Sequence, residues 1–208
     1  MAKVEKTVFA LFDEHFPIHG HEIEAGYTSL DELIEFNPQH TIKKKSLTRY
    51  VEMANVSEKS MSIETSIVRQ YTSGTKFKNK DTLMARITPS LENGKTAFVD
   101  ILEDNDVAYG STEFIVMRTK NSTSPYWVYC LAKNENFRSY AISSMVGSSG
   151  RQRVHSDYLK KYRVDTKSLT NMSSFNNLAS PIFSLVSTYN AENQKLKVIR
   201  DLLLQRIA

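Results

Sequence analysis

Two stretches of the chain concentrate side chains that bind anions. Residues 41–95 carry 11 basic against 5 acidic side chains and residues 131–163 carry 7 against 2, whereas the whole chain of 208 residues has a formal charge of only +4. A local basic face attracts a polyanion more strongly than the net charge would suggest. The pattern therefore favours a polyanionic partner, and a solvated basic surface is the alternative explanation.

The sharpest anion-binding candidate is the segment GSSGRQRV at residues 147–154. Its glycines and serines expose backbone N–H groups beside Arg151 and Arg153, whose planar guanidinium groups fit phosphate or guanine. The segment lacks the Gly-Lys-Ser/Thr ending of a nucleotide-binding P-loop. A mobile surface loop is the alternative interpretation.

Residues that could carry catalysis or hold a metal form no recognisable constellation. The tetrapeptide at 37–40, Asn-Pro-Gln-His, lacks the second proline and the aromatic residue of the Asn-Pro-Pro-aromatic loop of adenine methyltransferases. His15, His19 and His21 are close in sequence, but no Cys lies near them and their spacing matches no structural zinc site. We expect a non-catalytic protein with no metal and no cofactor.

The composition places the chain among soluble globular proteins. Apolar residues make up 40% and charged residues 24% of the chain, and no apolar run is long enough to span a membrane. The first six residues mix acidic and basic side chains, so no secretory signal is visible. A single Cys beside seven Met is typical of a reducing compartment, and we expect a cytoplasmic protein.

The chain alternates between helical and strand patterns. Apolar residues at helical spacing predict a helix over residues 2–15, and Ser29 followed by Glu32 predicts a one- or two-turn helix that ends at Asn37. Runs rich in β-branched and aromatic residues predict strands at 50–53, 66–68, 82–87, 96–101 and 112–117. We therefore expect a mixed α/β (α+β) fold.

Helical spacing returns at Pro125 and continues to Met145. Pro125 suits the first turn of a helix, and Trp127 lies on the apolar face as a core anchor. Cys130 lies on the same kind of face with no obvious basic partner, so we expect a buried thiol rather than a nucleophile.

Residues 167–208 contain the most regular pattern in the sequence. Steps of three and four residues from Phe175 give an average period of 3.5, which is typical of a coiled-coil seam. Pro181 suits the first turn of this helix with Ser180 as its cap, so the main segment runs to Arg206 over about 39 Å. A helix folded back on its own domain is one explanation, and pairing with a partner chain is the other. The residues expected in the seam are Phe175, Leu178, Ile182, Leu185, Tyr189, Leu196, Ile199 and Leu203.

Five stretches of the sequence lie in the order found in one protein family. They are FKNKDTLMARITP at 77–89, LENGKTA at 91–97, GSTEFIVMR at 110–118, GSSGRQRV at 147–154, and AENQKL at 191–196 with IRDLLL at 199–204. From about Ser29 to Arg206 the chain thus resembles the DNA-specificity subunit of type I restriction-modification systems. Five stretches in one order are more specific than any one alone.

The resemblance implies a division of the chain into three parts. Residues 18–166 would form a target-recognition domain that reads one half of a split site on double-stranded DNA. Residues 167–208 would form a spacer and dimerisation helix, with a short helix in residues 1–17 packed against it. The family usually carries two recognition domains in one chain, so this chain corresponds to half a subunit, whether a working half, a fragment or a remnant.

The same resemblance implies partners. Adenine methyltransferase subunits would dock on the spacer helix, and the ATP-dependent restriction subunit would join indirectly. The chain itself would form a homodimer or pair with another specificity half. On the residues, the set that we expect to contact DNA is Lys43, Lys44, Lys45, Arg49, Arg69, Tyr71, Lys76, Lys78, Arg86, Lys95, Ser148, Ser149, Arg151 and Arg153.

Two functions from other classes stay open on the sequence. A structural or degenerate interaction protein would keep the helix pairing without sequence-dependent DNA affinity. A stand-alone nucleic-acid enzyme would need a metal or nucleotide site.

Overall fold

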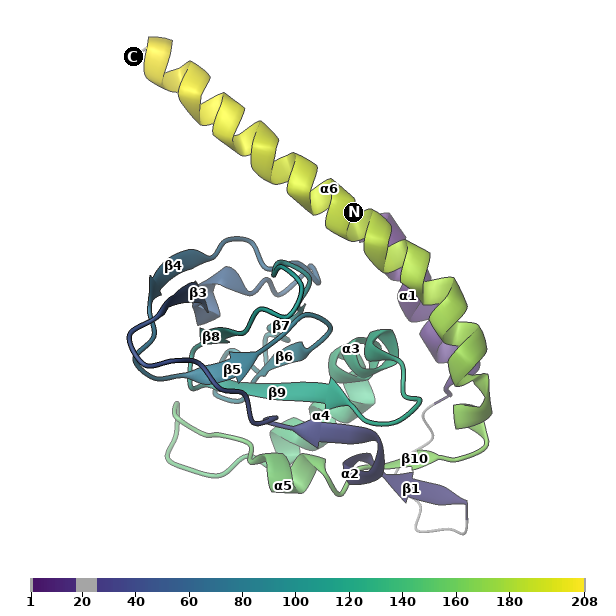
Figure 1. Cartoon of the computed structure of the whole chain (residues 1–208). Helices are drawn as coiled ribbons and strands as arrows, with labels where there is room; N and C mark the ends of the chain where they lie inside the picture. The colour runs from purple at the N-terminus through teal and green to yellow at the C-terminus, as the bar shows by residue number, and fades with distance from the viewer. Residues whose placement is uncertain (1, 18–25, 208) are drawn as a thin grey trace.

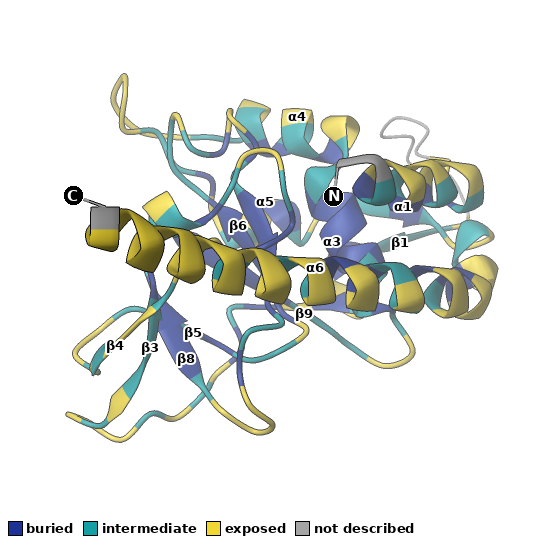
Figure 2. Cartoon of the chain, turned by 90° about the horizontal axis from the view of Figure 1, so that it is seen from above, coloured by how far each residue is buried: buried dark blue, intermediate teal, exposed yellow. Residues whose placement is uncertain are grey.

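The computed structural model describes residues 2–17 and 26–207, which form a globular body and one long projecting helix (Figure 1). The projecting helix is α6 (Met172–Ile207), and the N-terminal helix α1 (Ala2–His15) lies alongside its first half (Figures 1 and 2). The predicted mixed α/β fold with a long C-terminal helix is confirmed.

Three sheets build the globular body. The first has the strand order β2-β9-β6-β7 and is antiparallel throughout. The second has the order β4-β3-β8-β5, in which β3 and β8 run parallel. A third, two-stranded sheet joins β1 to β10. The strands are β1 (Tyr27–Ser29), β2 (Ile34–Phe36), β3 (Leu47–Val51), β4 (Ile67–Gln70), β5 (Thr75–Phe77), β6 (Thr82–Ala85), β7 (Thr96–Phe98), β8 (Ala108–Gly110), β9 (Phe114–Thr119) and β10 (Arg163–Asp165).

The central strands of the first sheet are buried on both faces. On β6, Met84 packs into the larger core with the helices, whereas Leu83 packs into a second core with Val51 and Phe77 of the second sheet. Successive side chains of a strand point to opposite faces, so a strand between two cores is a continuous apolar run. This explains why all four residues of β6 are buried.

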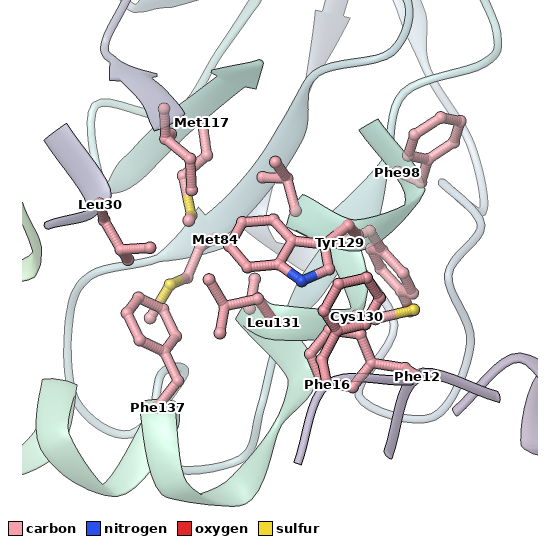
Figure 3. Close-up of a cluster of buried hydrophobic side chains, with 14 of the residues drawn as sticks. Phe12, Phe16, Leu30, Met84, Phe98, Met117, Tyr129, Cys130, Leu131 and Phe137 are labelled. Atoms are coloured by element: carbon pink, nitrogen blue, oxygen red, sulfur yellow. The ribbon is translucent and has the colours of Figure 1, made fainter. Parts of the chain in front are cut away.

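Helix α3 (Pro125–Lys133) supplies the centre of the larger core. Pro125 stands in its first turn, and Trp127 and Cys130 are buried as predicted. Figure 3 shows Cys130 of this helix among the side chains of the core. A single helix through Met145 was the wrong prediction. The chain breaks at Asn134, whose side-chain oxygen accepts the backbone N–H groups of residues 136 and 137 and thereby begins α4 (Glu135–Ser143).

The remaining helices are short. They are α2 (Leu30–Leu33), α5 (Ser156–Leu159) and the 3₁₀ turns η1 (Met53–Asn55) and η2 (Ser168–Asn171). Helix α2 follows Ser29 as predicted but ends at Leu33, and Ser29 makes no side-chain cap. Ile34 and Phe36 belong instead to β2, because pairing with β9 buries both side chains in the larger core.

Helix α6 begins inside the core of its own body. Phe175 is fully buried, with its ring 5.3 Å from Phe16 and 6.2 Å from Phe12 between centroids. Ala179, Phe183 and Val186 continue this buried face. The prediction that Phe175 belongs to a seam for a partner chain is therefore wrong, because the sequence period does not distinguish an internal face from an external one.

Pro181 lies inside α6 and not in its first turn, which corrects the predicted start of the helix. Its ring nitrogen cannot donate to the carbonyl of Asn177, four residues earlier. The turns before Pro181 stay helical because Phe175 and Ala179 are held in the core on that side. The helix of 36 residues is about 54 Å long.

Several large apolar side chains along α6 are exposed, and the second half of the helix is largely exposed (Figure 2). Leu196, Ile199 and Leu203 are 60%, 52% and 53% exposed. We call the exposed seam positions the apolar stripe: Leu178, Leu185, Tyr189, Leu196, Ile199 and Leu203. Ile182, between them, is half-buried against the core. Farther along the helix, the side chain of Gln194 donates to the carbonyl of Glu64 in the body.

Candidate nucleic-acid interface

A groove opens where four loop segments of the body meet. Residues 37–40 after β2 and residues 71–76, from the turn after β4 into β5, line it. Arg86 after β6, Thr112 just before β9 and Phe114 at the start of β9 complete the lining. Its volume is 290 Å³. We call it the basic groove, because Lys76 and Arg86 are its charged walls.

The loop that carries Lys43, Lys44 and Lys45, which we call the lysine loop, borders the basic groove. Lys45 donates its backbone N–H to the carbonyl of Tyr71, and the N–H of Tyr71 returns a bond to the carbonyl of Ser46. Lys45 adopts a left-handed φ of 64°, which turns the chain tightly into β3. Lys43, Lys44 and Lys45 are exposed. The fold thus brings this predicted cluster beside Tyr71 and Lys76.

Aromatic rings organise the cations next to the groove. The guanidinium carbon of Arg69 lies 3.3 Å from the ring centroid of Tyr50, and Arg69 Nε donates to the hydroxyl of Tyr109 at 2.9 Å. Tyr71 packs edge-on against Tyr109, and Lys76 Nζ lies 5.4 Å from the ring of Tyr71. Stacked Arg and Lys side chains lose little freedom on binding and keep their charge available.

A buried ion pair underlies the groove. Asp81 is fully buried and receives Arg118 Nε at 2.8 Å and the backbone N–H of Lys78 at 2.7 Å. Burial raises the pKa of Asp81, although the bonds from Arg118 oppose this effect. His40 Nε2 lies 4.0 Å from the same carboxylate. Burial and the charges of Arg118, Lys78 and Lys76 lower the pKa of His40 to about 4, so His40 is neutral at pH 7.

The segment at 147–154 forms the tip of a small hairpin beside the groove. Val146 and Arg153 exchange backbone hydrogen bonds across it, and Arg153 also bridges to Ile87. Its tip, residues 147–151, is exposed, so Ser148, Ser149 and Arg151 reach solvent. Figure 1 shows this hairpin, next to α5, and the lysine loop on the side of the body away from α1.

Arg153 differs from Arg151 in its environment. Its guanidinium holds both carboxylate oxygens of Glu113, with Nε at 3.0 Å from each and Nη2 at 2.7 Å from one. The hydrogen bond from Arg153 lowers the pKa of Glu113. Arg153 therefore fixes the hairpin to the loop before β9.

Two of the expected DNA contacts lie away from the basic groove. Arg49 donates to the hydroxyl of Ser66 and lines a different groove, between the body and α6. Lys95 Nζ donates to the carbonyl of Met53 at 3.1 Å. The structure therefore gathers the lysine loop, Arg69, Tyr71, Lys76, Lys78, Arg86 and the hairpin, and leaves Arg49 and Lys95 elsewhere.

Sequence reasoning did not assign residues 37–40 or Thr112 to this face. Nothing in their composition marks them, because the loop is polar and nearly uncharged. Only the pairing of β2 with β9, which sets Phe36 opposite Met117, brings residues 37–40 beside the loop that precedes β9.

No cluster of three or more His, Cys, Asp or Glu that could hold a metal is found in residues 2–17 and 26–207. His19 and His21, weighed above as metal ligands, lie outside the described residues. Within the same ranges, no helix is long and apolar enough to cross a membrane.

Comparison with known proteins gives no match in sequence and a clear one in structure. No family model matches the chain, and no curated protein matches it. The S subunit of the type I restriction-modification system of M. genitalium matches 97% of this chain and 51% of its own, at 15% identity and a TM-score of 0.50. A chain from a study of complex assembly and conformational transition in the type I R-M system matches 93% of this chain and 49% of its own, at 12% identity and a TM-score of 0.50.

This chain has the fold of about half of a type I S subunit. The HsdS subunit of Thermoanaerobacter tengcongensis is also similar, at 13% identity and a TM-score of 0.49, with 93% of this chain and 48% of that one covered. The chain spans about half the length of these proteins. The resemblance described in the sequence is thus confirmed at the level of the fold.

Proposed function

We propose that the chain recognises a DNA sequence as a half-size specificity subunit of a type I restriction-modification complex. The observation that carries this proposal is the match of nearly the whole chain to about half of an S subunit. The gathered cations of the lysine loop, Lys76, Arg86 and Arg151 support it, because phosphates are held by Arg and Lys and base edges are read from loops. We expect the chain to act in the cytoplasm, which agrees with its single Cys.

The three parts of the chain have separate tasks in this proposal. Residues 18–166 read one half of the site. Residues 167–208 form the spacer, with residues 1–17 packed on it, and the spacer docks adenine methyltransferase subunits. Transfer of a methyl group, and cleavage by the ATP-dependent restriction subunit, belong to those partners.

Pairing through the apolar stripe supplies the other half of the site. Leu196, Ile199 and Leu203 are more than half exposed, which is costly for Leu and Ile side chains in water. Helix α6, about 54 Å long, would then act as the spacer between the two recognition domains. A symmetric pair would read an inverted, interrupted repeat, and a pair with another specificity half would read an asymmetric one.

The test is to co-express the chain with its cognate methyltransferase and to map N6-methyladenine in the host DNA. Methylation of a bipartite motif that disappears when the chain is omitted is the expected result. A variant with Leu196→Asp and Ile199→Asp should lose that methylation while its globular body stays folded. Unchanged methylation of the same motif without the chain would refute the proposal.

The exposed stripe also favours a second candidate, an interaction protein that pairs through α6 without reading DNA. Charge reversal at Arg151 discriminates the two. Loss of DNA binding with intact pairing supports recognition, whereas pairing without any sequence-dependent affinity in the unmodified chain supports the second candidate. Cleavage or methylation of DNA by the purified chain alone would instead indicate an enzyme.

A further inference from the structure

We infer that the basic groove is a specificity pocket, in which Arg86 and His40 bind a hydrogen-bond acceptor of DNA, either the O6/N7 edge of a guanine or a phosphate oxygen. This inference rests on the proposed function and names the place where the recognition occurs. It depends on two buried nitrogen atoms, on the charges around them and on the size of the groove.

Arg86 presents a guanidinium with no acceptor. Its Nε is buried without a hydrogen bond, and within residues 2–17 and 26–207 it forms no salt bridge. Its backbone, in contrast, is clamped on both sides, by the carbonyl of Glu113 and by the N–H of Val154. A buried donor without a partner is costly, and an acceptor bound at Arg86 would remove that cost.

One carboxylate close to Arg86, that of Glu113, is bound by another arginine. Glu113 lies close enough to Arg86 for its pKa to be lowered by that charge, but both of its oxygens are bound by Arg153. Arg153 therefore acts as a positioning residue, because it holds the Glu113 carboxylate in place beside Arg86.

His40 supplies a second nitrogen without a hydrogen bond. Its side chain is 10% exposed, its Nε2 makes no hydrogen bond, and it lines the same groove as Arg86. The carboxylate that it faces, Asp81, is bound by Arg118. The neutral imidazole can donate to an acceptor or accept from a base amino group.

The remaining lining adds one cation, two aromatic rings and neutral polar groups. Lys76 adds a cation, Tyr71 adds an aromatic wall and Phe114 an apolar floor, and Gln39 and Thr112 add neutral polar groups at the rim. Arginine donates hydrogen bonds both to the O6 and N7 atoms of guanine and to phosphate oxygens. At 290 Å³ the groove is smaller than the ~300–1,000 Å³ of sites for whole drug-sized ligands.

The experiment begins by selecting the preferred duplex from a random pool with the full-length chain. Binding of that duplex, and of duplexes changed at one base pair each, is then measured for the unmodified chain, Arg86→Gln, Arg86→Lys and His40→Gln. Lys59→Gln is the matched control, because Lys59 is an exposed cation on the loop after η1 whose side chain makes no contact that the groove uses. Thermal unfolding of each variant verifies that it folds.

The two sources of the acceptor give different results. For a guanine edge, Arg86→Gln loses about tenfold or more in affinity and no longer discriminates at one base pair, and Arg86→Lys does not restore discrimination. For a phosphate, the loss is uniform over all duplexes, the salt dependence falls by about one charge, and Arg86→Lys restores most of the affinity. In both cases His40→Gln weakens the same contact.

The inference is overturned if folded Arg86→Gln and His40→Gln bind every duplex as Lys59→Gln does. That outcome leaves the proposed function standing, because the unmodified chain would still select a sequence. If the unmodified chain selects no sequence at all, the proposed function fails first and the inference fails with it.

Discussion

Arg153 donates to both carboxylate oxygens of Glu113, from Nε at 3.0 Å to each and from Nη2 at 2.7 Å to Oε1. The pair connects the exposed hairpin at 147–152 to the loop that begins β9, and both belong to the face where the lysine loop and the basic groove lie. Two arginines that are equivalent in the sequence thus have different roles. Arg151 is free to contact a ligand, whereas Arg153 holds the local architecture.

Arg151 and Arg153 should therefore respond differently to removal of their charge. Arg151→Ala should weaken DNA binding and reduce the salt dependence by about one charge, without a change in the thermal midpoint. Arg153→Ala should lower the thermal midpoint as well, because the hairpin loses its tie to Glu113. Fluorescence anisotropy against salt and calorimetry check both. Equal thermal midpoints for the two variants would show that the Arg153–Glu113 pair does not fix the hairpin.

The same pair should weaken in acid. The hydrogen bond from Arg153 holds the pKa of Glu113 below its ordinary value of 4.5. Because the pKa of Glu113 is lower in the folded chain than in the unfolded one, its ionisation stabilises the fold fully at pH values above 4.5. This contribution is lost as the pH falls through the lowered pKa. Hydrogen exchange of the hairpin amides should thus rise relative to the body below about pH 4.5, and Glu113→Gln should show the faster exchange already at pH 7. Equal exchange in Glu113→Gln and the unmodified chain would contradict this.

His40 should make stability depend on pH in a higher window. The pKa of His40 is lowered from 6.5 to about 4 because the side chain is buried near three cations. The unfolded chain then binds a proton that the folded chain rejects, so stability falls as the pH drops from 6.5 towards 4. His40→Gln should flatten that part of the curve in calorimetry. The exposed His155, changed to Gln, is the control and should leave the curve as it is.

Phe175 and Leu196 lie in one sequence pattern but should behave oppositely. Phe175→Ala should cost about 3–5 kcal/mol of stability, because the side chain is fully buried against α1. Leu196→Asp should leave the thermal midpoint of the body nearly unchanged and abolish association through α6, since Leu196 is 60% exposed. Calorimetry and analytical ultracentrifugation measure the two effects. A monomeric unmodified chain at high concentration would show that the apolar stripe does not pair copies of this chain.

Gly74 should tolerate no side chain. It has a φ of +144°, and a Cβ there would collide with the carbonyl of Gly110 on the neighbouring strand β8. Gly74→Ala should destabilise the fold by about 1–3 kcal/mol and displace the turn 71–76 that walls the basic groove. Gly150→Ala is the comparison, because Gly150 also has a positive φ but has nothing within 4 Å of the added carbon. A midpoint no lower for Gly74→Ala than for Gly150→Ala would contradict the expected collision.

The strands that were predicted and those that were missed differ in a physical way. The runs around Tyr50, Ile67, Leu83, Ala97 and Val116 each overlap a strand, because β-branched and aromatic residues favour a pleated, buried surface. The missed strands β1, β2, β5, β8 and β10 have three residues each. Segments that short have little periodicity of their own, and only their partners make them strands. Strand β7 also has three residues, but it was recognised because it lies in the longer apolar run 96–101.

The local sequence is enough to determine a mixed α/β body, a buried Trp127 and Cys130, basic stretches and a long apolar period at the C-terminus, because propensity and periodicity act over neighbouring residues. Which residues of that period face inward was decided by tertiary structure, since α1 packs on Phe175 and leaves Leu196 free. Tertiary structure also decided which cations meet. Segments far apart in sequence, such as residues 37–40 and the loop before β9, converge on the basic groove because β2, β6 and β9 pair in one sheet. The same pairing sets Arg86 beside Glu113, which Arg153 binds.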